Sequence, residues 1–213
     1  MADDEQAPEQ LPPAGAEDPD LAQTVAMQPG NIINGKYRVE HLIATGGMGA
    51  VLKAHHEVLD QTVAIKLMRP EIAQLQEAGQ RFLREARAAA KIDSDFVARV
   101  SDVDLLEDGT PFMVMEFLMG TDLSDLIDSG AEISVEQGVD YMMQALSGLD
   151  AAHALGLVHR DLKPSNLFLV SRADGSRRVK LLDFGISKVL DEAGSEALKA
   201  GAETATQAIL GTP

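Results

Sequence analysis

The residues best suited to chemistry in this sequence lie in one polar stretch, VHRDLKPSNLFLV, which spans 158–170. Apolar, strand-forming runs flank it on both sides, and a polar loop held by such a scaffold is a usual place for function. Its polar members are His159, Arg160, Asp161, Lys163 and Asn166. The carboxylate of Asp161, the carboxamide of Asn166 and the ammonium of Lys163 suit phosphate and Mg²⁺ chemistry, because hard oxygens bind the metal and a cation offsets developing charge.

Two further segments carry glycine or acid where a ligand would need them. The glycines of TGGMGAV (45–51) would let the backbone approach a phosphate closely and turn its N–H groups toward it. A glycine-rich hairpin without any ligand explains that segment equally well. Asp183 follows an apolar strand in LLDFG, although a single aspartate at a strand end is often only a turn former.

Lys66 and Glu85 form the next candidate pair. In TVAIKLM (62–68) the three apolar residues at alternating positions face away from Lys66. Glu85 shares the apolar stripe of a helix with Phe82 and Ala89. A carboxylate there is costly unless a cation meets it, so we expect Lys66 to pair with Glu85. The alternatives are that Lys66 is an ordinary snorkelling surface lysine and that Glu85 lies at the wet edge of the stripe.

Hydrophobic periodicity predicts the elements that must position these residues. Alternation predicts strands over 37–43, 50–56, 62–68, 97–106 and 111–117, with a hairpin turn at 107–110, and two short strands over 166–170 and 178–183 around a turn at Asp174-Gly175. Helical spacing predicts helices over 78–92, 121–127 and 135–155. The last of these begins at a capping box, Ser134 with Gln137, and stops at Gly156.

Composition excludes several classes of function. The net charge of −16 argues against nonspecific binding to nucleic acid. The absence of cysteine rules out disulfides, thiolate metal sites and a cysteine nucleophile, and fits a reducing compartment such as the cytoplasm. We expect no membrane segment, because no apolar run reaches about 18 residues and no signal peptide pattern is present. Residues 1–30 are acidic, without Lys or Arg, and predict a disordered tail, more a solvating extension than a docking segment.

Taken together and in this order, the motifs resemble the eukaryotic-like (Hanks-type) protein kinase family, especially its bacterial serine/threonine branch. HRDLKPSN and DFG are highly specific, and VAIK, RFLREA and VMEF support them at the expected positions between Ile33 and Pro213. The resemblance implies an α+β fold with two lobes. The N-lobe (31–115) would hold a five-stranded antiparallel sheet and one helix, the hinge would be 116–120, and an incomplete, helical C-lobe would span 121–213.

The resemblance also implies residue roles. Asp161 orients the attacking hydroxyl and accepts its proton, Lys163 steadies the γ-phosphate, and Lys66 holds the α- and β-phosphates. Asn166 and Asp183 bind Mg²⁺. The other residues expected to contact or support ATP are Ile43, Ala44, Gly46, Gly47, Met48, Gly49, Val51, Ala64, Glu85, Met115, Glu116, Leu118 and Asp122.

The implied activity is ATP- and Mg²⁺-dependent transfer of the γ-phosphate to Ser or Thr of protein substrates. Small-molecule phosphotransferases of related fold fit HRDLKPSN less well, and the five histidines show no metal-ligand spacing for a metal-only site or a nuclease. Arg160 beside Asp161 suggests control by a phosphorylated loop residue, for which Thr204 and Thr206 are candidates. A dimer is possible, and the sequence leaves the protein substrate open.

Two features depart from the family pattern. Ala44 stands where the glycine-rich loop usually begins with glycine, which we expect to weaken closure over the nucleotide. The sequence stops at LGTP, inside the implied activation segment, so the resemblance implies a truncated domain whose 135–155 helix has an uncovered apolar side. This keeps open the alternative of a catalytically impaired nucleotide-binding or regulatory module, or of a product without function.

Overall fold

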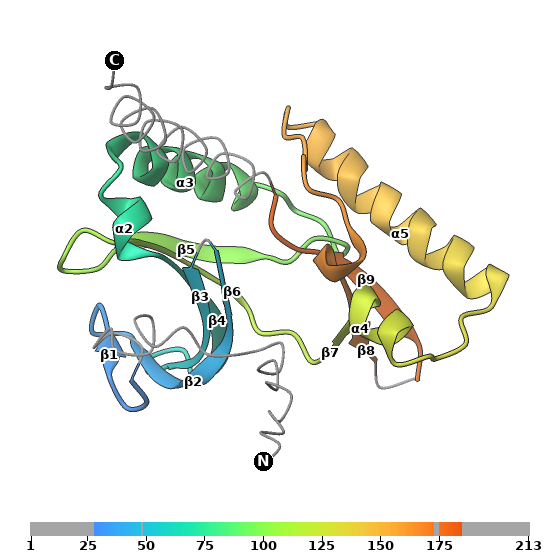
Figure 1. Cartoon of the computed structure of the whole chain (residues 1–213), viewed down its shortest axis with the longest axis horizontal. Helices are drawn as coiled ribbons and strands as arrows, with labels where there is room; N and C mark the ends of the chain where they lie inside the picture. The colour runs from blue at the N-terminus through green and yellow to red at the C-terminus, as the bar shows by residue number, and fades with distance from the viewer. Residues whose placement is uncertain (1–27, 48, 173–174, 185–213) are drawn as a thin grey trace, which may run out of the picture.

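Two antiparallel sheets flanked by helices make up the computed structural model, which describes residues 28–47, 49–172 and 175–184 (Figure 1). The predicted disordered tail, apart from residues 28–30, and the candidate threonines Thr204 and Thr206 lie outside the described residues. No helix in the described part of the chain is both long and apolar enough to cross a membrane.

The first sheet has six strands in the order β1-β2-β3-β4-β6-β5. Its strands are β1 (Ile32–Ile33), β2 (Tyr37–Gly46), β3 (Gly49–His56), β4 (Gln61–Met68), β5 (Val100–Leu105) and β6 (Pro111–Glu116). All five predicted strands are present. The predicted count of five is wrong, because the sheet has a sixth strand, the two-residue β1. A turn with positive φ at Asn34 (47°) and Gly35 (66°) folds β1 back onto β2. This Asn-Gly pair is a strong hairpin signal that the periodicity argument passed over, because β1 is too short to alternate.

The alternation predicted for β4 separates two layers of core. Ile65 and Leu67 pack on one face of the sheet with Leu52 and Phe112. On the other face Met68 packs against the helix α3, whose buried side chains include Phe82. The helices above this face are α2 (Pro70–Ala73), a single turn that was not predicted, and α3 (Gln76–Ala89). Figure 1 shows α3 lying across the curled sheet.

The second sheet joins β7 (Gly120–Asp122), β8 (Leu167–Ser171) and β9 (Arg177–Leu181) in that order. The predicted pair β8–β9 is confirmed, whereas β7 was not predicted, because its first residue falls in the expected hinge and its other two residues fall in the helix predicted over 121–127. Residue 174 of the predicted turn between β8 and β9 lies outside the described residues.

Two helices pack against this sheet, α4 (Leu123–Asp128) and α5 (Val135–His153). The Asp122 carboxylate caps α4 by accepting a hydrogen bond from Asp125 N. The predicted capping box of α5 is formed in both directions between Ser134 and Gln137. Gly156 takes a φ of 74° just beyond the helix, where a residue with a Cβ would be strained.

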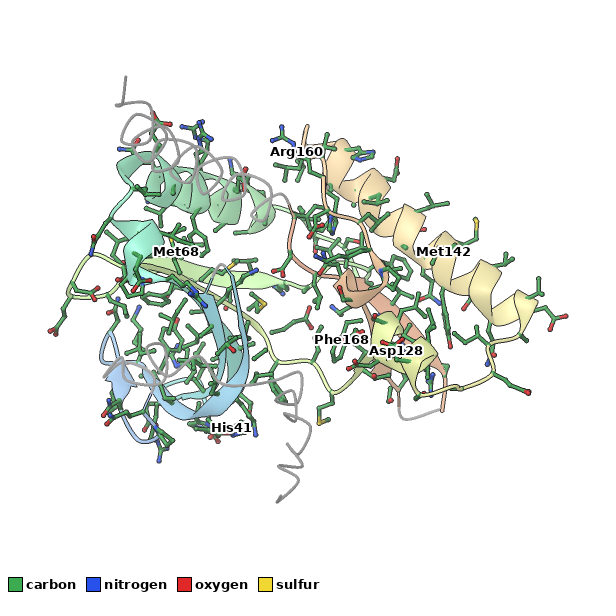
Figure 2. The ribbon with its side chains drawn as sticks, viewed as in Figure 1. His41, Met68, Asp128, Met142, Arg160 and Phe168 are labelled. Carbon is green, nitrogen blue, oxygen red and sulfur yellow. The ribbon has the colours of Figure 1, made fainter. Side chains whose placement is uncertain are left out.

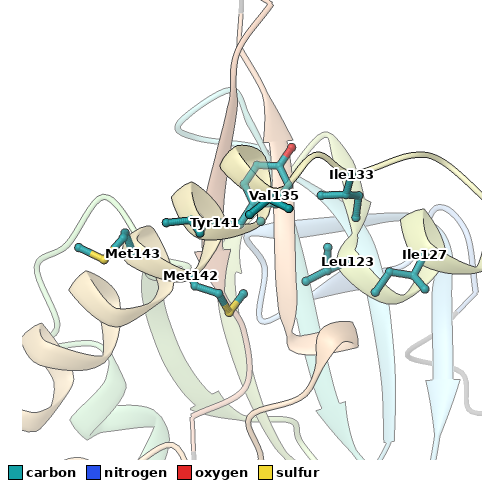
Figure 3. A pocket seen from close by; sticks show the side chains of 9 residues that line it. Leu123, Ile127, Ile133, Val135, Tyr141, Met142 and Met143 are labelled. Atoms are coloured by element: carbon teal, nitrogen blue, oxygen red, sulfur yellow. The ribbon is translucent and has the colours of Figure 1, made fainter.

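One face of α5 is apolar and exposed, as the sequence predicts. Its opposite face packs on β9 through residues such as Tyr141 and Ala145. Val135 (84% exposed) and Met143 (59% exposed) lie on the uncovered side. A hollow of about 480 Å³ runs between α4 and α5 beside this face, with Ile127 and Val139 in its lining (Figure 3).

Candidate functional site

Lys66 and Asp183 meet at the boundary between the two sheets. Lys66 Nζ lies 2.5 Å from Asp183 Oδ1, and the Lys66 residue is only 8% exposed. The alternative of a snorkelling surface lysine is therefore excluded. Lys66 is placed at mid-strand on β4, opposite Val51 of β3 and Met113 of β6, and Asp183 follows the end of β9.

The polar stretch after α5 folds into a compact loop around Asp161. Asn166 Nδ2 donates to the Asp161 backbone oxygen (2.7 Å) and to Asp161 Oδ2 (3.1 Å). Lys163 Nζ lies 3.0 Å from the same Oδ2. Leu182 N donates to the Asn166 backbone oxygen at 2.9 Å, so this loop is tied directly to the segment that carries Asp183. The structure thus brings the five predicted catalytic and metal-binding residues into one region, joined by hydrogen bonds and ion pairs.

His159 is a buried residue that links the loop to the segment before Asp183. Its ring is buried, which lowers its pKa, although hydrogen bonding to Leu182 opposes that shift. Because a carbonyl oxygen can only accept, His159 Nε2 donates to the Leu182 backbone oxygen at 2.8 Å, and the ring packs against the Phe184 ring with centroids 4.7 Å apart. Both rings are buried, and they pack against one another.

Two non-glycine residues of the site adopt left-handed backbone conformations, Arg160 (φ 62°) and Asp183 (φ 56°). Such conformations cost roughly 1–3 kcal/mol each and persist only where surrounding contacts enforce them. The Leu182–Asn166 and His159–Leu182 hydrogen bonds lie directly beside both residues. The chain therefore holds strain where its polar groups converge.

The expected pair between Lys66 and Glu85 is not formed. No ion pair or hydrogen bond joins these residues in the described part of the chain, and Lys66 is engaged by Asp183 instead. Glu85 Oε2 is buried and meets no hydrogen-bond partner among the described residues. Burial raises the pKa of Glu85, and the nearby guanidinium groups, foremost Arg160, oppose that shift. Figure 2 shows Arg160 between the ends of α3 and α5.

The glycine segment forms the closed end of the β2–β3 hairpin, where Gly46 pairs with Gly49. A Cβ on Gly49 would lie 1.8 Å from the Leu67 backbone oxygen, so only glycine fits that position. Ala44 pairs with Val51 just after an irregularity in β2. Ile43 and Gly47 are exposed on the same hairpin, and Met48 lies outside the described residues.

The predicted adenine-contacting residues lie along β6 and the segment that follows it. Met115 pairs with Ala64 of β4, and the Glu116 side chain accepts hydrogen bonds from Arg99 N (2.8 Å) and Lys180 Nζ (2.5 Å). Leu118 is half-buried beyond β6, whereas the Asp122 carboxylate is used as the cap of α4. The sequence argument missed Lys180, which ties β9 to this segment. The signal available was its position three residues before Asp183, on a strand expected to be apolar.

Comparison with known proteins identifies the family of the chain. A family model described as the protein kinase domain matches residues 37–212. The chain belongs to the protein kinase family. The serine/threonine-protein kinase pkn3 of Myxococcus xanthus is 39% identical over 162 residues, which cover 76% of this chain and 30% of that protein. The PknA kinase of Corynebacterium glutamicum is 40% identical over 161 residues, 74% of this chain and 34% of that protein.

The fold of this kinase chain is also shared with solved structures. The crystal structure of the Mycobacterium tuberculosis PknI kinase domain superposes with a TM-score of 0.66 at 30% identity, covering 76% of this chain and 64% of that one. The chain spans about a third of the length of the curated relatives it matches. The predicted two-lobed kinase fold is thereby confirmed.

Proposed function

We propose that this chain transfers the γ-phosphate of ATP to Ser or Thr residues of protein substrates with the help of Mg²⁺. The observation that supports the proposal best is the convergence of three separate chain segments, which carry Lys66, the pair Asp161 and Asn166, and Asp183. Bacterial relatives are named serine/threonine-protein kinases, and this supports Ser or Thr as the acceptor residue. Transfer of labelled phosphate to a generic basic protein tests the proposal.

The residues present fit a divalent metal. Because Asn166 Nδ2 donates to Asp161, the Asn166 carboxamide oxygen is left as an acceptor, and Asp183 adds carboxylate oxygens close by. Hard oxygen donors of this kind suit Mg²⁺. No group of three or more His, Cys, Asp or Glu that could hold a metal exists within the described residues. A metal held by these two side chains would therefore take its other ligands from phosphate and water, and when bound it would neutralise phosphate charge.

The chain's own residues then have separate tasks. Asp161 would orient the acceptor hydroxyl and receive its proton, with Asn166 fixing the carboxylate and Lys163 beside it for the γ-phosphate. Lys66, freed in part from Asp183, would hold the α- and β-phosphates and pair with Glu85. That rearrangement would give a cation to Glu85 Oε2, which is buried and has no hydrogen-bond partner among the described residues.

The remaining proposed contacts to the nucleotide follow from where the residues lie on the first sheet and in the segment after β6. The β2–β3 hairpin would cover the phosphates, Val51 and Ala64 would pack on adenine, and the backbones of Glu116 and Leu118 would meet its edge. Met115 would stand as gatekeeper behind adenine, and Asp122 would lie near the ribose. We also propose the lobe division 31–115, 116–120 and 121–213. The cytoplasmic location, the lack of nucleic-acid binding and a dimer stay predictions.

A catalytically impaired nucleotide-binding or regulatory module is the second candidate. The Lys66–Asp183 pair favours it, because this pair occupies both a phosphate-binding cation and a metal-binding carboxylate. Both candidates bind ATP, and they differ in whether labelled phosphate reaches a protein acceptor.

A further inference from the structure

Arg69 reaches from the end of β4 to the closed end of the β2–β3 hairpin. Its Nε donates to the Gly46 backbone oxygen at 3.1 Å, across 23 positions of sequence. Gly46 pairs with Gly49 and Gly49 pairs with Met68, so Arg69 follows the last β4 residue that is in register with the hairpin. The arginine therefore connects the end of β4 to the terminal residue of β2, past β3, which lies between these two strands.

The Gly46 carbonyl lies where a contact can fix the position of the hairpin turn. It belongs to the last residue of β2, directly before the turn that would lie over the phosphates. Glycine-rich backbone loses more conformational entropy on ordering than any other, so the turn needs contacts to hold one position. A guanidinium is a rigid, preorganised donor, and a hydrogen bond from a charged group is stronger than one between neutral groups.

We propose that Arg69 is a positioning residue that fixes the glycine hairpin over the phosphates of the nucleotide through its bond to Gly46. The inference rests on the proposed function, because it assumes that ATP binds beneath the β2–β3 hairpin. Arg69 acts through the hairpin backbone, so its removal weakens recognition of the phosphates and leaves recognition of the adenine and ribose unchanged.

Three variants of the full chain isolate this effect. Arg69→Met removes the donor and the charge but keeps an unbranched side chain, and Arg69→Lys keeps a charged donor without the planar group. Arg87→Met, the control, removes an exposed arginine in the last turn of α3. The probes are ATP with Mg²⁺ and adenosine, each titrated calorimetrically. We expect Arg69→Met to raise the Kd for ATP about three- to tenfold, the value of one hydrogen bond, with Arg69→Lys in between and the Kd for adenosine unchanged.

Hydrogen exchange of the nucleotide-free protein separates positioning from direct attraction between charge and phosphate. We expect faster exchange in Arg69→Met in peptides that contain Gly46 and Gly47, and wild-type exchange in Arg87→Met. An unchanged Kd for ATP in Arg69→Met, an equal loss of affinity for adenosine, or weakened ATP binding without faster exchange at the hairpin would each overturn the inference. If the wild-type chain bound neither ATP nor adenosine, the proposed function would fail, whereas the exchange result would still decide whether Arg69 holds the hairpin.

Discussion

Lys66 and Asp183, which stand 117 positions apart in the sequence, form a largely buried ion pair with 2.5 Å between Nζ and Oδ1. Each of these groups is proposed to hold a different part of ATP·Mg²⁺. Their direct pairing means that they neutralise one another in this conformation, while Glu85 stays without the cation expected for it. If ATP·Mg²⁺ binds as proposed, its binding would be coupled to an exchange of partners at Lys66.

Replacement of Lys66 tests the role of that exchange. Lys66→Met keeps the length and most of the volume of the buried side chain, so we expect the fold to be retained. We expect phosphate transfer to fall at least about 100-fold, because positioning and electrostatic stabilisation of the phosphates are both lost. The measurement is the initial rate of labelled phosphate transfer at saturating ATP. A variant that transfers phosphate at the wild-type rate would remove Lys66 from the mechanism.

Glu85 should make stability depend on pH. Because burial raises its pKa above the ordinary value of 4.5, the folded chain binds this proton more tightly than the unfolded chain does. The stabilising contribution is thus fully present below pH 4.5 and is lost as pH rises through the folded-state value. As pH rises from 4.5 through the folded-state pKa, we expect the free energy of unfolding of the wild type to fall relative to that of Glu85→Gln. Urea denaturation at a series of pH values measures it, and parallel pH profiles of the two proteins would refute it.

Lys180 should stabilise the junction between β9 and β6. Its Nζ contacts Glu116 Oε1 at 2.5 Å and the Val97 backbone oxygen at 3.3 Å, and the lysine side chain is largely buried. Lys180→Met leaves the Glu116 carboxylate without its cation, so we expect a loss of about 1–3 kcal/mol in the free energy of unfolding. Lys91→Met, which alters an exposed lysine, serves as the control and should stay within about 0.5 kcal/mol of wild type. Equal stabilities of the two variants would show that the contact contributes nothing.

The exposed apolar face of α5 should bind hydrophobic dye. Val139 and Met143 are both more than half exposed, so replacing them by lysine removes apolar surface without opening a cavity. We expect Val139→Lys/Met143→Lys to lower the fluorescence of bound anilinonaphthalene sulfonate at least twofold and to reduce aggregation on heating. Glu132→Lys changes the net charge by the same amount at an exposed position without removing apolar surface. If it lowered dye binding equally, charge and not the α5 face would explain the result.

Local signals in the sequence predicted most of the fold. The capping box of α5 and the glycine beyond its end depend on neighbours in sequence, and both are present as predicted. The alternation in β4 correctly assigned its two faces to different layers of core. The two-residue β1 and the three-residue β7 were missed, because neither is long enough to show a period.

The sequence predicted which residues belong to the candidate site, but it did not predict which of them form ion pairs with one another. Lys66 was expected to meet Glu85 on the argument that a buried carboxylate needs a cation. That argument shows that Glu85 needs a cation but does not identify which carboxylate Lys66 binds, since Asp183 competes for the same lysine from a segment distant in sequence. The same limit applies to Lys180 and Arg69, whose partners are set by how the strands associate and not by sequence spacing.

Phosphate transfer to a protein is the most direct test of the central claim. The chain is incubated with γ-labelled ATP, Mg²⁺ and a generic basic protein, in parallel with Asp161→Asn, which keeps the size of the side chain but cannot accept the proton of the acceptor hydroxyl. We predict label on Ser or Thr of the acceptor with the wild-type chain and at least a 100-fold lower rate with Asp161→Asn, the contribution expected of a general base together with its positioning role. Equal labelling by both proteins, or none by a wild-type chain that binds ATP, would contradict the account.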